Sequence, residues 1–165
     1  MTAAAMAVSA STENEAPDSS QFLTFVCAGE EYGVDILCVQ EIKGWDGVTR
    51  VPYTPPYLLG VMNLRGVIVP VIDLRTRFGV QQRAPDSSTV VIVVRVHSET
   101  GEKTAGIVVD AVSEVYSVTP ENIKTTPDLG AVADSACVRG LASVDGKMVM
   151  LLDIDRLVAS SVEVT

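Results

Sequence analysis

Two stretches of this chain repeat one spacing of glycine, charge and apolar residues, and this repeat constrains the fold most. Residues 54–74 align without gaps on residues 134–154, so that Gly66 matches Gly146. Residues 33–42 align in the same way on residues 106–115. The two matches indicate an internal duplication.

Val dominates the apolar residues, which make up 47% of the sequence. Because Val is stiff at χ1 and favours strands, we predict an all-β fold. Each copy of the duplication is short and best closes into a five-stranded β-barrel, because closure removes exposed sheet edges. We expect the two barrels to pack together, with the matched segments around Val39 and Val112 lining the seam between them.

The predicted ordered domain covers residues 21–158, with one subdomain over residues 21–82 and the other over residues 83–158. Residues 1–20 are rich in Ala, Ser, Glu and Pro without periodicity, which is typical of a disordered tail. We expect residues 159–165 to form a flexible C-terminus.

Local signals predict short helical turns between the strands. Asp35 can cap one helical turn, and the segment from Thr54 to Gly60 reads as a compact helix with Pro55 at its first position. Another short helix is expected after Asp153.

The strand pattern includes three more specific predictions. A hairpin turn falls at Asn63–Gly66, and residues 104–118 read as a continuous strand. Pro70 lies inside a strand, and since Pro cannot donate to a ladder, this strand is expected at an edge or with a bulge.

The charge balance disfavours nucleic acid and anionic membranes as partners. The net charge is −9 and the pI about 4.5, whereas phosphate binding relies on Lys and Arg. No apolar run reaches the roughly 20 residues that cross a bilayer, and the N-terminus has no basic signal region. Three unpaired cysteines, Cys27, Cys38 and Cys137, are typical of a reducing compartment, so we expect a soluble cytoplasmic protein.

No motif in the sequence predicts catalysis, a metal site or a cofactor. His97 lies in a polar turn, and residues 101–104 lack the glycine spacing of a phosphate-binding loop. Asp73 and Asp153 read as polar strand ends or helix caps. The competing hypotheses are a small enzyme that uses these two aspartates, a nucleic-acid-binding barrel, and a regulatory barrel of a larger kinase.

Glu41 and Arg65 are the charged residues that stand out. Arg65 is at the tip of a hairpin whose frame recurs in the second copy, where Asp145 takes its place. Residues that only maintain the fold should match between copies. Three alternatives stay open: Arg65 contacts a partner, it pairs with Glu41 and braces the turn beside a binding surface, or it is a solvated charge at a position free to drift.

The sequence "EEYGVDILCVQEI" at residues 30–42, "TPPYLLGVMNLRGVIVPVIDLR" at residues 54–75 and "GIVVDAVSEV" at residues 106–115 closely resemble the CheW family of bacterial chemotaxis coupling proteins. The resemblance implies two SH3-like five-stranded barrels and an adaptor without catalytic activity. Such an adaptor couples methyl-accepting chemoreceptor tips to the histidine kinase CheA. It implies a cytoplasmic protein recruited to membrane-associated receptor arrays, with other CheW copies as possible ring neighbours.

The resemblance also implies a receptor-binding groove and leaves the kinase-binding residues unknown. Glu41 and Arg65 match the family's charged pair beside the groove, and the two glycines match positions where a side chain would disturb it. An alternative function is a CheW-like regulatory module of another receptor–kinase system with an output other than motility. The groove residues implied are Ile36, Val39, Glu41, Gly60, Arg65, Gly106, Val109 and Val112.

Overall fold

The computed structural model describes residues 20–98, 101–124 and 137–162, and within them the chain forms two antiparallel-rich β-sheets. The expected disordered tail lies outside these residues except for Ser20, which begins the first strand. The six-stranded sheet has the order β8 (Ala111–Val118), β1 (Ser20–Cys27), β2 (Glu30–Asp35), β11 (Lys147–Leu152), β10 (Val138–Val144) and β9 (Ile123–Lys124). The five-stranded sheet has the order β3 (Val39–Gly44), β6 (Val90–Ser98), β7 (Gly101–Val109), β5 (Val67–Asp73) and β4 (Leu58–Leu64).

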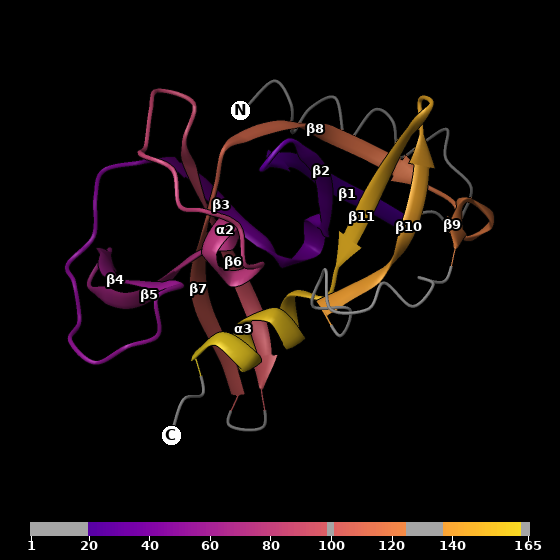
Figure 1. The fold of residues 1–165 in the computed structure, drawn as a ribbon. Helices are drawn as coiled ribbons and strands as arrows, with labels where there is room; N and C mark the ends of the chain where they lie inside the picture. The colour runs from indigo at the N-terminus through magenta and orange to yellow at the C-terminus, as the bar shows by residue number, and fades with distance from the viewer. Residues whose placement is uncertain (1–19, 99–100, 125–136, 163–165) are drawn as a thin grey trace.

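The chain crosses between the sheets at two points. It leaves the six-stranded sheet through the 3-10 helix η1 (Ile36–Cys38) and returns at Asp110, between β7 and β8. Figure 1 shows the resulting two lobes, with β3–β7 on one side and β1, β2 and β8–β11 on the other. The expected sequence boundary near residue 82 therefore falls between β5 and β6 of one sheet and does not separate the two sheets.

The duplication predicted from the sequence is visible in the strand pairing. In the five-stranded sheet β5 runs parallel to β7 with Val71 opposite Gly106, and in the other sheet β11 runs parallel to β2 with Leu151 opposite Gly33. Each glycine faces the core of its own sheet, because a Cβ on Gly106 would meet Val91 and a Cβ on Gly33 would meet Leu151. The two copies thus use their glycines for the same packing.

Three apolar clusters hold the molecule together. One lies within each sheet, and the largest, here called the central core, is shared by both sheets. The central core includes Phe25 from β1 and Leu152 from β11, together with Ile92 from β6 and Ile107 from β7. Burying each such side chain stabilises the fold by about 1.5–3 kcal/mol. This arrangement confirms the predicted all-β class with two packed β subdomains.

Several local predictions are confirmed. The Asp35 side chain accepts a hydrogen bond from the Leu37 backbone N–H and caps η1. The hairpin between β4 and β5 turns at Arg65 and Gly66. A helix follows Asp153 as expected, since the Asp153 side chain accepts a bond from the Arg156 N–H at the start of α3 (Ile154–Val162).

The helix α3 covers the segment predicted to be helical after Asp153 and continues to Val162. The first residues of the expected flexible C-terminus are therefore helical, and residues 163–165 lie outside the described part. Leu157 and Val158 of this helix are buried in the central core, which explains why the helix persists. Two further short helices are α2 (Leu74–Arg77) and the 3-10 helix η2 (Pro120–Asn122).

Three local predictions differ from the structure. The helix expected from Thr54 to Gly60 is absent, because after one turn at Pro55–Leu58 the chain enters β4. Pro70 is expected in an edge strand or at a bulge, but its strand β5 lies between β4 and β7. The parallel pairing of β5 with β7 begins only at Val71, so the missing N–H of Pro70 breaks no bond of that ladder. The irregularity in this part of the sheet lies in β4, between Leu58 and Gly60. The continuous strand expected over residues 104–118 is broken at Asp110, where the chain changes sheets.

Candidate interaction surface

The four apolar residues predicted to line the seam gather around the two crossings between the sheets. Ile36 is the first residue of η1 and Val39 follows its end, while Val109 and Val112 lie on either side of Asp110. The structure packs all four into or against the central core that both sheets share. Val109 is 1% exposed and supports the seam from inside, whereas the other three are half-buried and present part of their surface.

Leu37 is an apolar residue of this region that the sequence reasoning missed. It lies in η1 between Ile36 and Cys38, and its side chain is 86% exposed. A single helical turn cannot direct three consecutive side chains into one core. The helical turn predicted here could therefore have indicated that one of its apolar residues is exposed. The exposed Leu37 extends the apolar surface next to the half-buried Ile36 and Val39.

Glu41 and Arg65 form the ion pair that the sequence suggested. The Arg65 Nη1 donates to Glu41 Oε2 at 2.6 Å, which joins the β4–β5 hairpin tip to β3. The Arg65 side chain is 70% exposed and that of Glu41 24%, so solvent screens the pair and its contribution to stability is under about 1 kcal/mol. The pair therefore fixes the orientation of Arg65 more than it stabilises the protein.

The hairpin tip holds Arg65 in an unusual backbone conformation. Arg65 and Gly66 both have positive φ, at 52° and 87°, and the equivalent Asp145 and Gly146 of the second copy have 49° and 75°. Two-residue hairpins with positive φ at both positions favour Asn, Asp or Gly at the first. Asp145 fits this preference, whereas Arg65 does not. The conformational cost at Arg65 is consistent with a role for its side chain beyond the turn.

Gly60 and Gly106 do not lie on the exposed part of the seam. A Cβ on Gly60 would be 2.2 Å from the backbone oxygen of Thr49, and one on Gly106 would be 2.8 Å from the Val91 side chain. A Cβ on Gly140, the counterpart of Gly60, would be 2.7 Å from the Lys124 carbonyl oxygen. Both predicted glycines therefore serve close packing within the five-stranded sheet.

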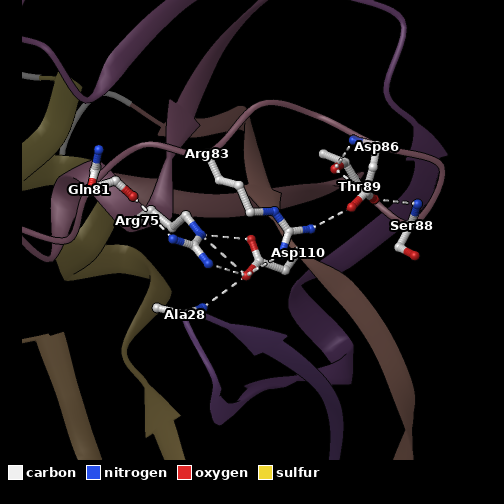
Figure 2. Close-up of polar contacts among 8 residues, drawn as sticks. All are labelled: Ala28, Arg75, Gln81, Arg83, Asp86, Ser88, Thr89 and Asp110. Atoms are coloured by element: carbon white, nitrogen blue, oxygen red, sulfur yellow. Dashed lines mark hydrogen bonds and ion pairs between the residues drawn. The ribbon is translucent and has the colours of Figure 1, made fainter.

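A second polar cluster is centred on Asp110 at the return crossing (Figure 2). The Asp110 carboxylate accepts hydrogen bonds from Arg75 Nε and Nη2, at 3.0 Å and 2.9 Å, and from the backbone N–H of Ala28 at 3.0 Å. Arg83 lies 3.7 Å from the same carboxylate and also contacts Asp86. Asp110 thus connects the β1–β2 turn of the six-stranded sheet to α2, the short helix that comes directly after β5 of the five-stranded sheet.

The environment of Asp110 favours its charged form. Burial opposes ionisation, but the Arg75 and Ala28 hydrogen bonds and the Arg75 and Arg83 charges outweigh it and lower the pKa of Asp110 below 3.8. The Asp110 hydrogen bond correspondingly raises the pKa of Arg75. Burial, followed by the Asp110 charge, raises the pKa of the neighbouring Cys27 thiol to about 12.

The residues considered for catalysis are dispersed. The His97 side chain is 74% exposed and lies 3.7 Å from Glu102. Asp73 ends β5, where its carboxylate accepts from the Thr76 hydroxyl, while Asp153 follows β11 of the other sheet and caps α3. The two aspartates share no site. Among the described residues, no group of three or more His, Cys, Asp or Glu side chains could hold a metal ion.

No helix in the described ranges has the length and apolar character needed to span a membrane.

The structure combines two pseudo-symmetric β subdomains that share a core with an apolar seam and a charged hairpin tip held by an ion pair. These features are typical of a protein that binds other proteins. Comparison with known proteins identifies the group to which it belongs. The family model of the CheW-like domain matches residues 21–162, and this chain belongs to the CheW family.

Named relatives and a solved structure agree with this assignment. The chain is 46% identical over 140 residues to the chemotaxis protein CheW of Klebsiella aerogenes, covering 85% of this chain and 82% of the relative. It is 36% identical over 137 residues to a probable chemotaxis protein CheW of Rhizobium etli, covering 83% and 86%. The crystal structure of the scaffolding protein TtCheW from Thermoanaerobacter tengcongensis superposes with a TM-score of 0.77 at 36% identity, covering 84% of this chain and 91% of that one.

Proposed function

We propose that this protein is a non-catalytic chemotaxis adaptor that couples the cytoplasmic tips of methyl-accepting chemoreceptors to a CheA-type histidine kinase. The observation that carries the proposal is the 46% identity to a chemotaxis protein CheW over most of both chains. The seam around the two crossings and the Glu41–Arg65 pair add support, because both are features of a surface for protein binding.

The receptor partner fits the seam by shape and chemistry. A receptor tip is a helical hairpin, and an apolar helix face can lay side chains spaced at i, i+3, i+4 and i+7 along an apolar groove. Ile36, Leu37, Val39 and Val112 offer such an apolar wall, and Arg65 lies at a hairpin tip held against β3 by Glu41. We propose that these residues contact the receptor, with Val109, Gly60 and Gly106 supporting the surface from within.

The kinase partner is the regulatory domain of CheA, which resembles this fold. Contacts of micromolar strength, about −8 kcal/mol, suffice when the partners are arrayed, because linked binding events raise the overall affinity. Binding to receptors then recruits the adaptor to membrane-associated arrays, in which further copies of it can take part.

Calorimetric titration tests the proposal directly. The protein is titrated with the regulatory domain of a CheA-type kinase from the same organism, and separately with a receptor-tip fragment. We expect saturable one-to-one binding of the kinase domain. Absence of binding to both partners at high micromolar concentration would contradict the proposal.

Arg65→Glu, together with a double variant that also changes Glu41, tests whether Arg65 contacts a partner or only holds the turn in place. We expect it to weaken coupling in the ternary complex by roughly tenfold, about 1.4 kcal/mol, while the fold is retained. Lys147→Glu is the matched control, because it makes the same charge change beside the equivalent hairpin of the second copy. If the double variant Glu41→Arg/Arg65→Glu restores binding, Arg65 acts through its ion pair; if binding stays weak, Arg65 contacts the partner.

A further inference from the structure

The connection between β3 and β4 forms a second exposed surface, separate from the seam. Figure 1 shows this connection running along the outer side of the five-stranded sheet. Two reciprocal backbone hydrogen bonds of 2.8 Å between Thr49 and Val61 fix its beginning, and a bond of 2.7 Å from the Asp73 N–H to the Tyr57 carbonyl fixes its end. The loop between these anchors is therefore held in one shape.

Tyr53 at the tip of this loop combines an unfavourable backbone with a fully exposed side chain. Its φ is +63°, and it follows Pro52 in a turn that the Thr54 hydroxyl closes by donating to the Val51 carbonyl at 3.1 Å. A turn with Pro at its second position and positive φ at its third is of type II, where Gly or Asn is favoured. The Tyr53 side chain is 103% exposed, so no packing within the described chain offsets this cost.

Next to Tyr53 the loop lines an open hollow of about 650 Å³. Its wall mixes polar and apolar residues, and three prolines, Pro52, Pro55 and Pro56, make the apolar part rigid. Prolines and an aromatic ring lose little conformational freedom when a partner binds, which favours association. A smaller hollow of about 270 Å³, lined in part by Trp45, shares Arg50, Leu59 and Gln82 with it.

The charge of this surface is positive, although the whole chain carries −9. Arg50 lines both hollows and is the one charged residue that lines the larger. It forms no ion pair or side-chain hydrogen bond with the residues that the structure describes. In the smaller hollow, Arg75 and Arg83 already face Asp110, which leaves Arg50 as the guanidinium available to an incoming carboxylate.

We propose that Tyr53, Arg50 and the proline-lined hollow form a docking site for an acidic protein segment with an aromatic or large apolar side chain beside its carboxylate. The carboxylate pairs with Arg50, and the apolar side chain packs on Tyr53 and the prolines. Arginine and tyrosine are the residues most often enriched at such contact centres. The site is separate from the receptor-binding seam proposed above.

Nuclear magnetic resonance titration of the full chain tests this site. The probe is a mixture of short synthetic peptides that each carry one aromatic residue flanked by Glu, and the matched mixture carries Lys in place of Glu. We expect the acidic mixture to shift the Tyr53 and Thr54 amides and the Arg50 Nε–H resonance in a saturable way. Arg50→Glu should weaken this binding by roughly tenfold or more.

Two further variants keep the test decisive. Tyr53→Asn suits the turn and retains the fold, and it should also weaken peptide binding. Arg95→Glu makes the same charge change at an exposed position of β6 and should leave binding unchanged. Equal binding of the basic mixture, shifts confined to the seam, or no shifts at millimolar peptide would overturn the proposal. Broadening of the Tyr53 resonance with protein concentration alone would also overturn it, by showing that the surface binds a second copy instead.

Discussion

Replacing Asp110 with Asn tests whether this carboxylate holds the return crossing together. Asn keeps the size of the side chain but removes its charge and turns one acceptor into a donor. Arg75 and the Ala28 N–H would then face a neutral amide instead of a carboxylate that accepts from both. The substitution leaves the apolar cores untouched, so its effect reports on the polar cluster alone.

The expected loss of stability is about 3 kcal/mol. Removing one partner of a buried ion pair costs about 3–5 kcal/mol, because the other charge stays buried without compensation. The Arg75 and Asp110 side chains are 18% and 13% exposed, so some solvent reaches the pair and the lower end applies. For a chain of this size each kcal/mol lowers the melting temperature by about 2–4 °C, which gives a decrease of roughly 6–12 °C by circular dichroism.

The pH dependence should change in a defined direction. Because the pKa of Asp110 is lower in the folded protein than its usual value of 3.8, the unfolded state binds more protons between these two pKa values. The contribution of Asp110 to stability is therefore complete above pH 3.8 and declines as the pH falls through the folded pKa. Asp110→Asn should lose this part of the acid-side slope, and denaturant unfolding at several pH values measures it.

A matched control and a double-mutant cycle assign the effect. Asp86→Asn removes a carboxylate that also pairs with Arg83 but is 52% exposed, so its loss should cost under about 1 kcal/mol. In the cycle, Arg75→Met combined with Asp110→Asn should destabilise less than the sum of the two single changes. A loss below 1 kcal/mol for Asp110→Asn, or additive effects in the cycle, would refute the reasoning.

Three other outcomes are expected from the structure. Gly60→Ala should lower the melting temperature strongly or prevent folding, because its Cβ would be 2.2 Å from the Thr49 oxygen, and circular dichroism will show this. Tyr53→Gly should raise the free energy of unfolding by about 1 kcal/mol in a urea titration, because it relieves the positive φ; a decrease would contradict the assignment of strain. Cys27 should resist a thiol reagent at pH 8 in the folded protein, since its pKa is raised to about 12 and it is buried, and rapid labelling would contradict this.

Much of the fold could be predicted from the sequence because the duplication repeats residues with strict backbone needs. The pairs Gly33/Gly106 and Gly66/Gly146 occupy equivalent places in the structure, one pair facing a sheet core and the other in a hairpin turn. The helix expected at Thr54–Gly60 is wrong because helix signals at Thr54 and Pro55 are local, whereas pairing of β4 with β5 is not. Tertiary pairing overrides such local preferences.

The crossings could not be predicted in the same way. An apolar run in the sequence does not indicate which of two sheets its residues join. The break at Asp110 inside residues 104–118 is therefore apparent only in the structure, where β8 pairs with β1 of the other sheet. For the candidate site, the sequence did single out Glu41 and Arg65, since Glu41 lies beside an apolar strand and Arg65 is at a hairpin tip where the second copy has Asp145. It missed Leu37 and the surface around Tyr53, because exposure of an apolar side chain depends on what packs around it.

The division of the six-stranded sheet between the two ends of the chain has a consequence during synthesis. Its hairpin of β1 and β2 leaves the ribosome first, but its neighbours β8 and β11 follow only after the whole five-stranded sheet. At about 5–20 residues per second, the hairpin waits on the order of ten seconds for β11. The β1 edge gains its neighbour β8 earlier, but the β2 edge stays unpaired for the whole of that time and can pair with strands of other nascent chains. The order in which the strands emerge therefore sets the period when this protein is most prone to aggregate.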